Sequence, residues 1–85
     1  MEVIEQQLRD ETEKWLEKIN KERKIVNAND EKGADLLKNV DAYIEDTQHF
    51  LEKNDLIRAF EAVVWAWSWL EIGKELGIFR TGQHS

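Results

Sequence analysis

The stretch AVVWAWSWLEIG at residues 62–73 determines the architecture of this chain of 85 residues, because it is compatible with two secondary structures. Its tryptophans stand at every second position, which is the spacing of one face of a half-buried β-strand. The alternation ends after five residues, whereas apolar residues recur at steps of three and four through the whole segment 55–76. The longer pattern outweighs the shorter one, so we predict a single helix over about 55–77.

On a helix, the three tryptophans of this stretch point to two different sides. Trp67 falls on the main apolar stripe, together with Leu56, Ala59, Phe60, Val63, Ala66, Leu70 and Gly73. Trp65 and Trp69 fall on the back of the helix, where Ile72 and Leu76 join them. Each tryptophan offers ~150–250 Å² of surface for burial, and an apolar patch of this size is rarely left exposed on a soluble monomer. We therefore expect another helix or another molecule to cover the back.

Two covers for this second apolar side fit the sequence. A first helix could cross both of the others, with Trp15 and Ile19 as its contacts, and close a three-helix bundle. Alternatively, a second copy of the protein could pack there and form a two-fold dimer. An aromatic stripe with helical spacing is more often part of a core, so we favour the first arrangement. The candidate interaction residues are Trp65, Trp69, Ile72, Leu76 and Trp15.

Two further helices are predicted, at about 2–26 and 33–53, each from a stripe of apolar residues at helical spacing. The first stripe is Ile4, Leu8, Thr12, Trp15, Leu16, Ile19 and Val26, and the second is Leu37, Val40, Ile44, Thr47 and Leu51. Between them, NANDEKG at 27–33 is predicted to form a loop, with Asn29 or Asp30 as the N-cap of the second helix.

The connection KND at 53–55 is so short that the helices on its two sides are expected to be antiparallel neighbours. Asn54 or Asp55 is placed to cap the third helix. Gly77 is a natural left-handed C-cap, after which Ile78 folds back onto the last turn. The expected fold is therefore all-α: a single-domain, up-down-up three-helix bundle built on an antiparallel helical hairpin, with residues 80–85 as a disordered tail.

The composition excludes several classes of protein. The chain has no cysteine, which excludes disulfides, zinc knuckles, thiol catalysis and Fe–S clusters. Its formal net charge of −6 disfavours nucleic-acid binding, which needs clustered basic residues. No apolar run approaches the ~20 residues that span a bilayer, and the acidic, amphipathic start MEVIEQQLRD is unlike a signal or transit peptide. We therefore expect a cytoplasmic protein that binds neither nucleic acid nor membrane.

The sequence offers no set of residues that supports catalysis. His49 lies on the polar side of the second helix, where a lone histidine is usually a surface residue. Asp41 and Glu45 share that side, but no Glu-x-x-His motif accompanies them, and two solvated carboxylates hold a cation only weakly. Ser68 lacks the context of a nucleophile elbow, and the chain has no Gly-rich phosphate loop. We expect no enzyme, no metal and no cofactor.

Residues 42–79 carry a pattern that resembles a known family. It consists of a Tyr before an acidic pair, an aromatic–Leu pair, a turn with Asp, an Ala-rich helix with an aromatic–Ala pair, and a late Leu–Gly. The matching residues are Tyr43, Glu45, Asp46, Phe50, Leu51, Asn54, Asp55, Ala59, Trp65, Ala66, Leu76 and Gly77. The pattern resembles an archaeal family of short helical proteins, the domain of unknown function 357, in which glycine is usual in place of Asn54. The resemblance implies a small all-helical fold and an archaeal origin, but no activity and no site.

Three functions remain as hypotheses. The preferred one is a structural or interaction module whose apolar surface binds another protein or a second copy, giving a homodimer. The alternative is a nucleotide- or RNA-binding accessory module, because residues 43–66 are similar to the hairpin of HEPN-like helical domains. Its phosphate contacts would be Arg58, Lys74 and Arg80. The third is a small-molecule pocket lined by Trp15, Trp65, Trp67 and Trp69.

Overall fold

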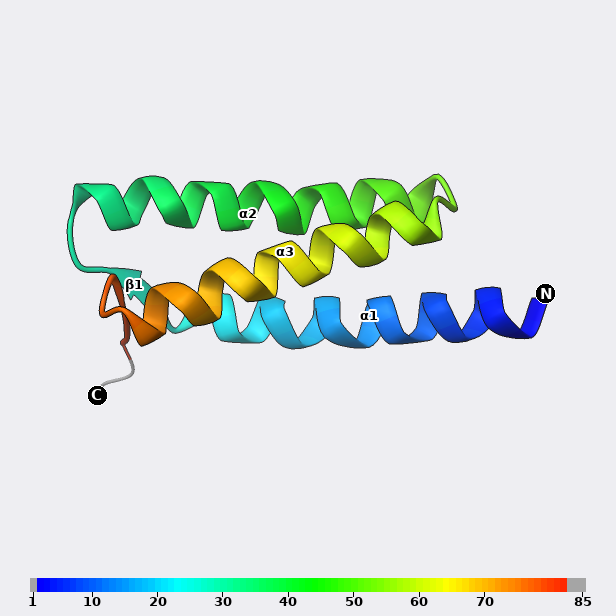
Figure 1. The fold of residues 1–85 in the computed structure, drawn as a ribbon, viewed down its shortest axis with the longest axis horizontal. Helices are drawn as coiled ribbons and strands as arrows, with labels where there is room; N and C mark the ends of the chain where they lie inside the picture. Colours follow the sequence, from blue (N-terminus) through cyan, green and yellow to red (C-terminus); the bar gives the residue numbers. More distant parts are fainter. Residues whose placement is uncertain (1, 83–85) are drawn as a thin grey trace.

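A computed structural model describes residues 2–82 of the chain. Its elements, in chain order, are α1 (Glu2–Lys24), β1 (Val26–Ala28), α2 (Glu31–Glu52), α3 (Leu56–Glu75) and β2 (Phe79–Thr81). α2 runs antiparallel to both α1 and α3 (Figure 1). The predicted up-down-up bundle of three helices is therefore confirmed, and residues 62–73 belong to one continuous helix, as the longer apolar pattern predicts.

α3 is the helix that the other two share. It packs closely against α2 and also contacts α1, whereas α1 and α2 make few contacts with each other. Its buried residues are Leu56, Ala59, Ala62, Val63, Ala66, Leu70 and Gly73. The alanines keep this side of α3 narrow, so α2 can approach it closely. Ile19 from α1 and Val40 from α2 are fully buried in the same core.

An aspartate begins each of the two later helices. α2 starts at Glu31, two residues before the predicted start, because the side chain of Asp30 accepts a hydrogen bond from the backbone N–H of Gly33 at 2.8 Å. α3 starts after Asp55, whose carboxylate accepts a hydrogen bond from the N–H of Arg58 at 3.4 Å. Of the two candidate caps at each position, the aspartate is therefore the one used.

α3 ends in the reversal that Gly77 predicts. Gly77 adopts a left-handed φ of 75°. Its N–H donates to the carbonyl of Lys74 at 3.2 Å, and the N–H of Ile78 donates to the carbonyl of Gly73 at 2.8 Å. These two bonds form a Schellman motif, which satisfies carbonyls that would otherwise lack a partner at the helix end.

α2 ends in the same motif, but with asparagine in place of glycine. Asn54 has a φ of 61°, its N–H donates to the carbonyl of Leu51 at 3.0 Å, and the N–H of Asp55 donates to the carbonyl of Phe50 at 2.8 Å. Asparagine tolerates the left-handed region better than other side chains with a Cβ. The side chain of Asn54 also accepts a hydrogen bond from Arg9 of α1 at 2.5 Å, so this turn is a point of attachment for the first helix.

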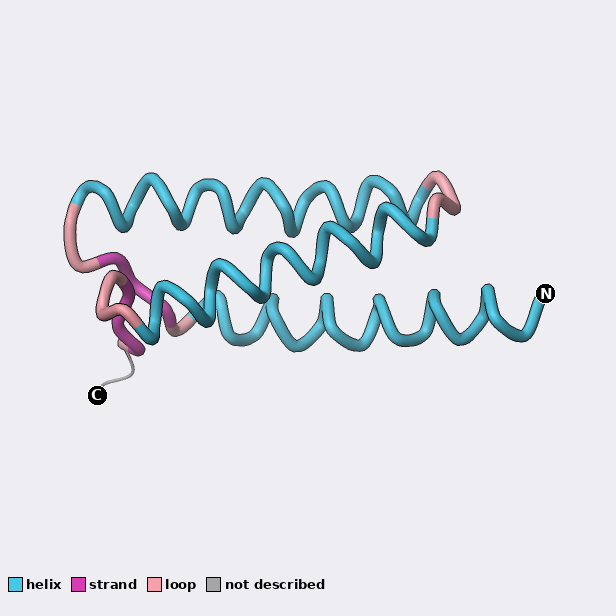
Figure 2. The backbone as a smooth tube through the Cα atoms, viewed as in Figure 1, coloured by secondary structure: helices cyan, strands magenta, loops and turns pink. Residues whose placement is uncertain are grey.

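A small two-stranded sheet is the main difference from the prediction (Figure 2). β1 and β2 pair antiparallel, with Val26 opposite Thr81 and Ala28 opposite Phe79. The first helix therefore stops at Lys24 instead of reaching 26, and the predicted loop at 27–33 begins as a strand. The predicted disordered tail at 80–85 is wrong for residues 80 and 81, which lie in β2, while residues 83–85 lie outside the described part of the chain.

The physical reason for this sheet is the chain reversal after α3. The turn at Gly77 sends the chain back toward the core, where the side chains of Phe79 and Val26 become almost fully buried, with 3% and 2% exposure. The pairing joins residues more than fifty positions apart, and neither strand is long enough to show a periodic pattern. A sequence-based search for local periodicity therefore could not find it.

Gly73 makes room for Phe79. A Cβ at position 73 would lie 2.3 Å from the nearest ring carbon of Phe79, far inside van der Waals contact. Because that ring is held in the core, it cannot simply turn away into solvent. The glycine in the last turn of α3 is therefore needed for packing and not for its backbone conformation, since only Gly77 and Asn54 among the described residues have positive φ.

We predict that Gly73→Ala destabilises the protein although alanine favours helices. The clash with Phe79 should cost ~1–3 kcal/mol, which exceeds the gain of at most ~1 kcal/mol in helix propensity. The free energy of unfolding, measured by urea denaturation, should therefore fall. Glu75→Ala, a change at an exposed residue of the same turn, is the control and should alter the free energy of unfolding by no more than ~0.5 kcal/mol. An unchanged or raised stability of Gly73→Ala would contradict the packing of Phe79 on α3.

Substitutions of Asn54 test the turn between α2 and α3, to which Arg9 of α1 is hydrogen-bonded. Asn54→Ala keeps the Cβ in the left-handed region and removes the acceptor for Arg9, so we expect a loss of ~1–2 kcal/mol in unfolding free energy. Asn54→Gly relaxes the backbone and loses only the contact with Arg9, so it should be more stable than the alanine variant by about 1 kcal/mol. Denaturation of both variants measures the difference. Equal stabilities would show that the turn carries no backbone strain.

Candidate functional site

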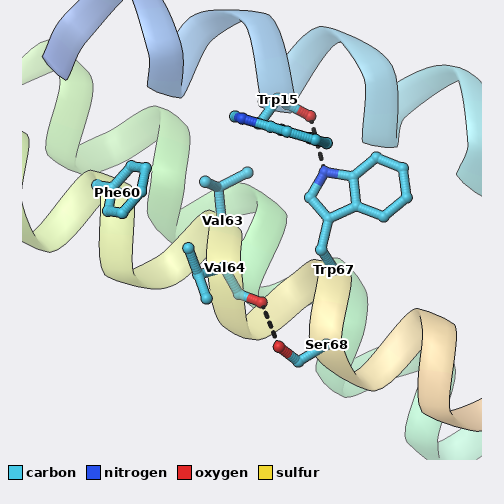
Figure 3. A pocket seen from close by; sticks show the side chains of 6 residues that line it. All are labelled: Trp15, Phe60, Val63, Val64, Trp67 and Ser68. Carbon is cyan, nitrogen blue, oxygen red and sulfur yellow. Dashed lines mark hydrogen bonds between the residues drawn. The ribbon is translucent and has the colours of Figure 1, made fainter.

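Two tryptophans join α1 to α3 (Figure 3). The indole N–H of Trp67 donates a hydrogen bond to the backbone carbonyl of Trp15 at 3.1 Å. The two rings meet edge to face, with centroids 5.8 Å apart and planes at 83°. The N–H of Trp15 donates in turn to the carboxylate of Glu11 at 2.9 Å, and the Lys18 ammonium lies 4.8 Å from the Trp15 ring. Both indoles thus have their polar atom satisfied and their rings in contact.

A pocket of about 300 Å³ lies beside this pair, open to solvent and mainly apolar. Its lining residues are Trp15, Phe60, Val63, Val64, Trp67 and Ser68 (Figure 3). The hydroxyl of Ser68 donates to the carbonyl of Val64 at 2.8 Å, as serine commonly does within a helix, so it is not oriented for chemistry on a ligand. The predicted four-tryptophan pocket is wrong in its composition, because Trp65 and Trp69 do not line this one.

The predicted interaction side of α3 remains largely exposed. We call Trp65, Ile72 and Leu76 the outer α3 face; their exposed fractions are 54%, 45% and 68%. Trp65 lies flat against Tyr43 of α2, with ring centroids 6.3 Å apart and planes 18° from parallel. Trp69 is half-buried and packs against the core. The outer α3 face is therefore a surface with a pre-positioned indole at one end.

The favoured expectation that α1 covers this side is wrong. Trp15 of α1 meets Trp67, and Ile19 enters the common core, so α1 lies along the opposite flank of α3 from Trp65. The reason is the width of the main stripe on α3, which is broad enough to receive α2 and α1 side by side. α1 therefore covers Trp67 and leaves Trp65 uncovered. The other possibility, that a second molecule covers Trp65, is still a prediction.

Ion pairs tie α1 to both other helices. Arg23 of α1 makes a two-pronged pair with Asp41 of α2, at 2.7 and 3.1 Å. Lys74 of α3 reaches Glu22 of α1 at 2.7 Å and Glu71 at 3.3 Å. The hydrogen bond to Glu22, opposed by partial burial and supported by Glu71, raises the pKa of Lys74 above its ordinary value. Lys74 is therefore charged at physiological pH and occupied by its own carboxylates.

The three basic residues suggested as phosphate contacts are not brought together. Arg58 and Lys74 stand at opposite ends of α3, about 24 Å apart along the helix axis. Arg58 lies 3.7 Å from Asp55, and Arg80 donates to the carbonyl of Ala28 at 2.8 Å and to the side chain of Asn29 at 3.0 Å. No concentrated basic patch results from this set.

The remaining candidates for chemistry are also separate. His49 is exposed near the end of α2 and lies against Phe50. Asp41 is engaged by Arg23, whereas Glu45 is exposed. Within residues 2–82, no three His, Asp or Glu side chains are close enough to hold a metal ion. None of the helices in that range is long and apolar enough to cross a membrane.

Two residues with clear roles at these surfaces were not singled out from the sequence. Tyr43, which belongs to the family pattern and borders the apolar stripe of the second helix, supports the exposed Trp65. Arg9 reaches across from the first helix to the turn at Asn54. Each role depends on a contact between different helices, and the spacing along one helix carries no signal for it.

Comparison with known proteins agrees with this architecture. The family described as "Protein of unknown function (DUF357)" matches residues 9–79. Curated proteins give no match. Among solved structures, the chain is similar to protein AF1782 from Archaeoglobus fulgidus, an archaeal member of the same family, with 49% identity and a TM-score of 0.85. The comparison covers 92% of this chain and 97% of that one. The match thus extends well beyond residues 42–79 to include most of α1, and the chain belongs to the DUF357 family.

Proposed function

We propose that the protein is a non-catalytic interaction module that associates with a second copy of itself through the outer α3 face. The observation that carries the proposal is the exposure of Trp65, Ile72 and Leu76 together on one side of α3, away from the side that packs against α2 and α1. Apolar surface of this kind on a small protein is typical of a protein–protein contact. The proposal places the protein in the cytoplasm and assigns it no cofactor.

The spacing of the three residues suits a two-fold contact. Trp65 and Ile72 are seven residues apart, so they lie on the same side of α3, and Leu76 follows one turn later. If two α3 helices met antiparallel, Trp65 of each would lie against Ile72 of the other, which is the reciprocal pairing a two-fold axis requires. The stack on Tyr43 holds the indole in place before association, which lowers the entropy lost on binding.

Nucleotide or RNA binding finds less support as an alternative. Its three basic residues are dispersed and have nearby acidic or carbonyl partners. The net charge of −6 also opposes attraction to a polyanion.

We expect the double variant Trp65→Glu, Ile72→Glu to be a folded monomer under conditions in which the unchanged protein dimerises. Two carboxylates in an apolar seam cannot be desolvated without a large cost, whereas both positions are exposed in the single molecule. Sedimentation velocity over a range of concentrations measures the association, and circular dichroism checks the fold. Trp69 is left unchanged, because it packs against the core and a change there would also affect the stability of the fold.

Ile57→Glu is the matched control. Ile57 is a 66% exposed apolar residue on α3, outside the outer α3 face, so the same chemical change there should leave the dimer intact. The proposal fails if the unchanged protein is a monomer at high concentration, or if the double variant associates as strongly as the parent.

A further inference from the structure

A second unpartnered surface lies on the other flank of α3, where it faces the first half of α1. Three hollows follow one another there, and they share lining residues: Phe60 lines the first two, and Ile4 and Leu8 line the second and third. The hollows thus form one continuous depression, which we call the α1–α3 groove. Its apolar lining includes Ile4, Leu8, Trp15, Ile57, Phe60, Val64 and Trp67.

The groove exists because α1 and α3 diverge. α3 begins beside the end of α2 and approaches α1 only toward its own end (Figure 1). The apolar contacts of α1 accordingly begin near Trp15 and Ile19, whereas Ile4 and Ile57 near the open end are 64% and 66% exposed. In this half, Arg9 bridges the gap by hydrogen bonds to the turn at Asn54. A strip of apolar side chains is therefore left without a partner on both walls.

The length of the groove and the spacing of its apolar residues suit an α-helix. Ile4, Leu8 and Trp15 are spaced by four and seven residues, so they form one row along α1, about 16 Å long. Phe60, Val64 and Trp67 form a facing row on α3 with helical spacing. A helix of about three to four turns could place an apolar stripe between these two rows, which is the helix-in-groove mode of recognition.

The charged residues that line the groove indicate which kind of helix it would bind. Within residues 2–82, the charged side chains that line the two hollows at the open end are Glu5, Asp10, Glu11 and Asp55, all acidic. Basic side chains lie beside two of them, Lys14 at 3.9 Å from Glu11 and Arg58 at 3.7 Å from Asp55, whereas Glu5 and Asp10 form no ion pair with the described residues. The partial positive charges of the two helix N-termini nearby, ~0.5 each, still leave this end negative. Lys18 stands farther along, over the ring of Trp15. A second copy fits this end poorly, because it brings the same carboxylates and a net charge of −6.

We infer that the α1–α3 groove binds a basic amphipathic helix of a partner protein. The apolar stripe of that helix contacts Ile4, Leu8 and Phe60, and its Lys or Arg residues pair with the carboxylates at the open end. This surface is separate from the outer α3 face, so the inference does not depend on self-association.

A synthetic 14-residue helix of Leu and Lys, with leucines at helical spacing on one side, is a suitable probe. Its matched control replaces every Lys with Glu. We expect the Lys peptide to bind the full chain with a dissociation constant that rises with salt, and the Glu peptide not to bind. Trp15 and Trp67 report occupancy by fluorescence, and amide chemical-shift mapping by NMR locates the peptide.

The variants separate groove binding from general attraction to an acidic protein. Ile4→Ser with Ile57→Ser changes two exposed positions and should weaken binding about tenfold or more, because apolar contact is lost on both walls. Glu5→Gln with Glu11→Gln should weaken binding and flatten its salt dependence, while the glutamine at 11 keeps an acceptor for Trp15. Trp65→Ser on the outer α3 face is the control and should bind as the parent does.

Several results would overturn the inference. Equal binding of the Lys and Glu peptides would remove the role of the carboxylates. Unchanged affinity after the isoleucine changes, or chemical shifts spread over the whole acidic surface, would show attraction by charge alone. If the isoleucine changes abolish self-association while Trp65→Ser does not, the occupant is a second copy, and both the inference and the proposed dimer contact are wrong.

Discussion

The structure depends on α3 being shared between two partners. α2 and α1 both pack against one side of this helix, and the buried residues on that side contact both of them. Alanines lie along the side that packs against the neighbouring helices, and Val63 and Leu70 fill the space between them. The packing of Phe79 on Gly73 adds the end of the chain to the same core. If α3 were displaced, α1 and α2 would have little to hold them, because they make few direct contacts with each other.

The two ends of the bundle are closed by different means. At one end, the Schellman turn at Asn54 and the capping Asp55 reverse the chain with hydrogen bonds between neighbours in sequence. That end also contains Arg9, which reaches from α1 to the turn at Asn54. At the other end, the short sheet joins residues after α1 to residues after α3 and pulls these two helices together. The helices therefore meet closely where the sheet is and separate where only Arg9 joins them, which opens the α1–α3 groove.

The same asymmetry explains why a molecule of 85 residues has two candidate surfaces. α3 carries more apolar surface than one pair of neighbours can cover. Its outer face keeps Trp65, held flat by Tyr43, and its other flank contributes Phe60 and Ile57 to the groove. The two surfaces differ in chemistry, since the first joins aromatic and aliphatic residues in a reciprocal pattern and the second is flanked by carboxylates.

The sequence by itself determined the three helices and the turns beside α3, because these depend on interactions between residues a few positions apart: the apolar period of α3, a pair of cap candidates before each later helix, and the left-handed turn at Gly77. The structure selected Asp30 and Asp55 from those pairs and set the end of α1 and the start of α2. The tertiary structure alone decided which flank of α3 receives α1, that Tyr43 supports Trp65, and that residues 26–28 pair with 79–81. A periodic pattern shows that two sides of a helix are apolar, but it does not say which neighbour will cover which side. That choice follows from how the chain reverses at each end and from which side chains then fit together, and both are properties of residues far apart in the sequence.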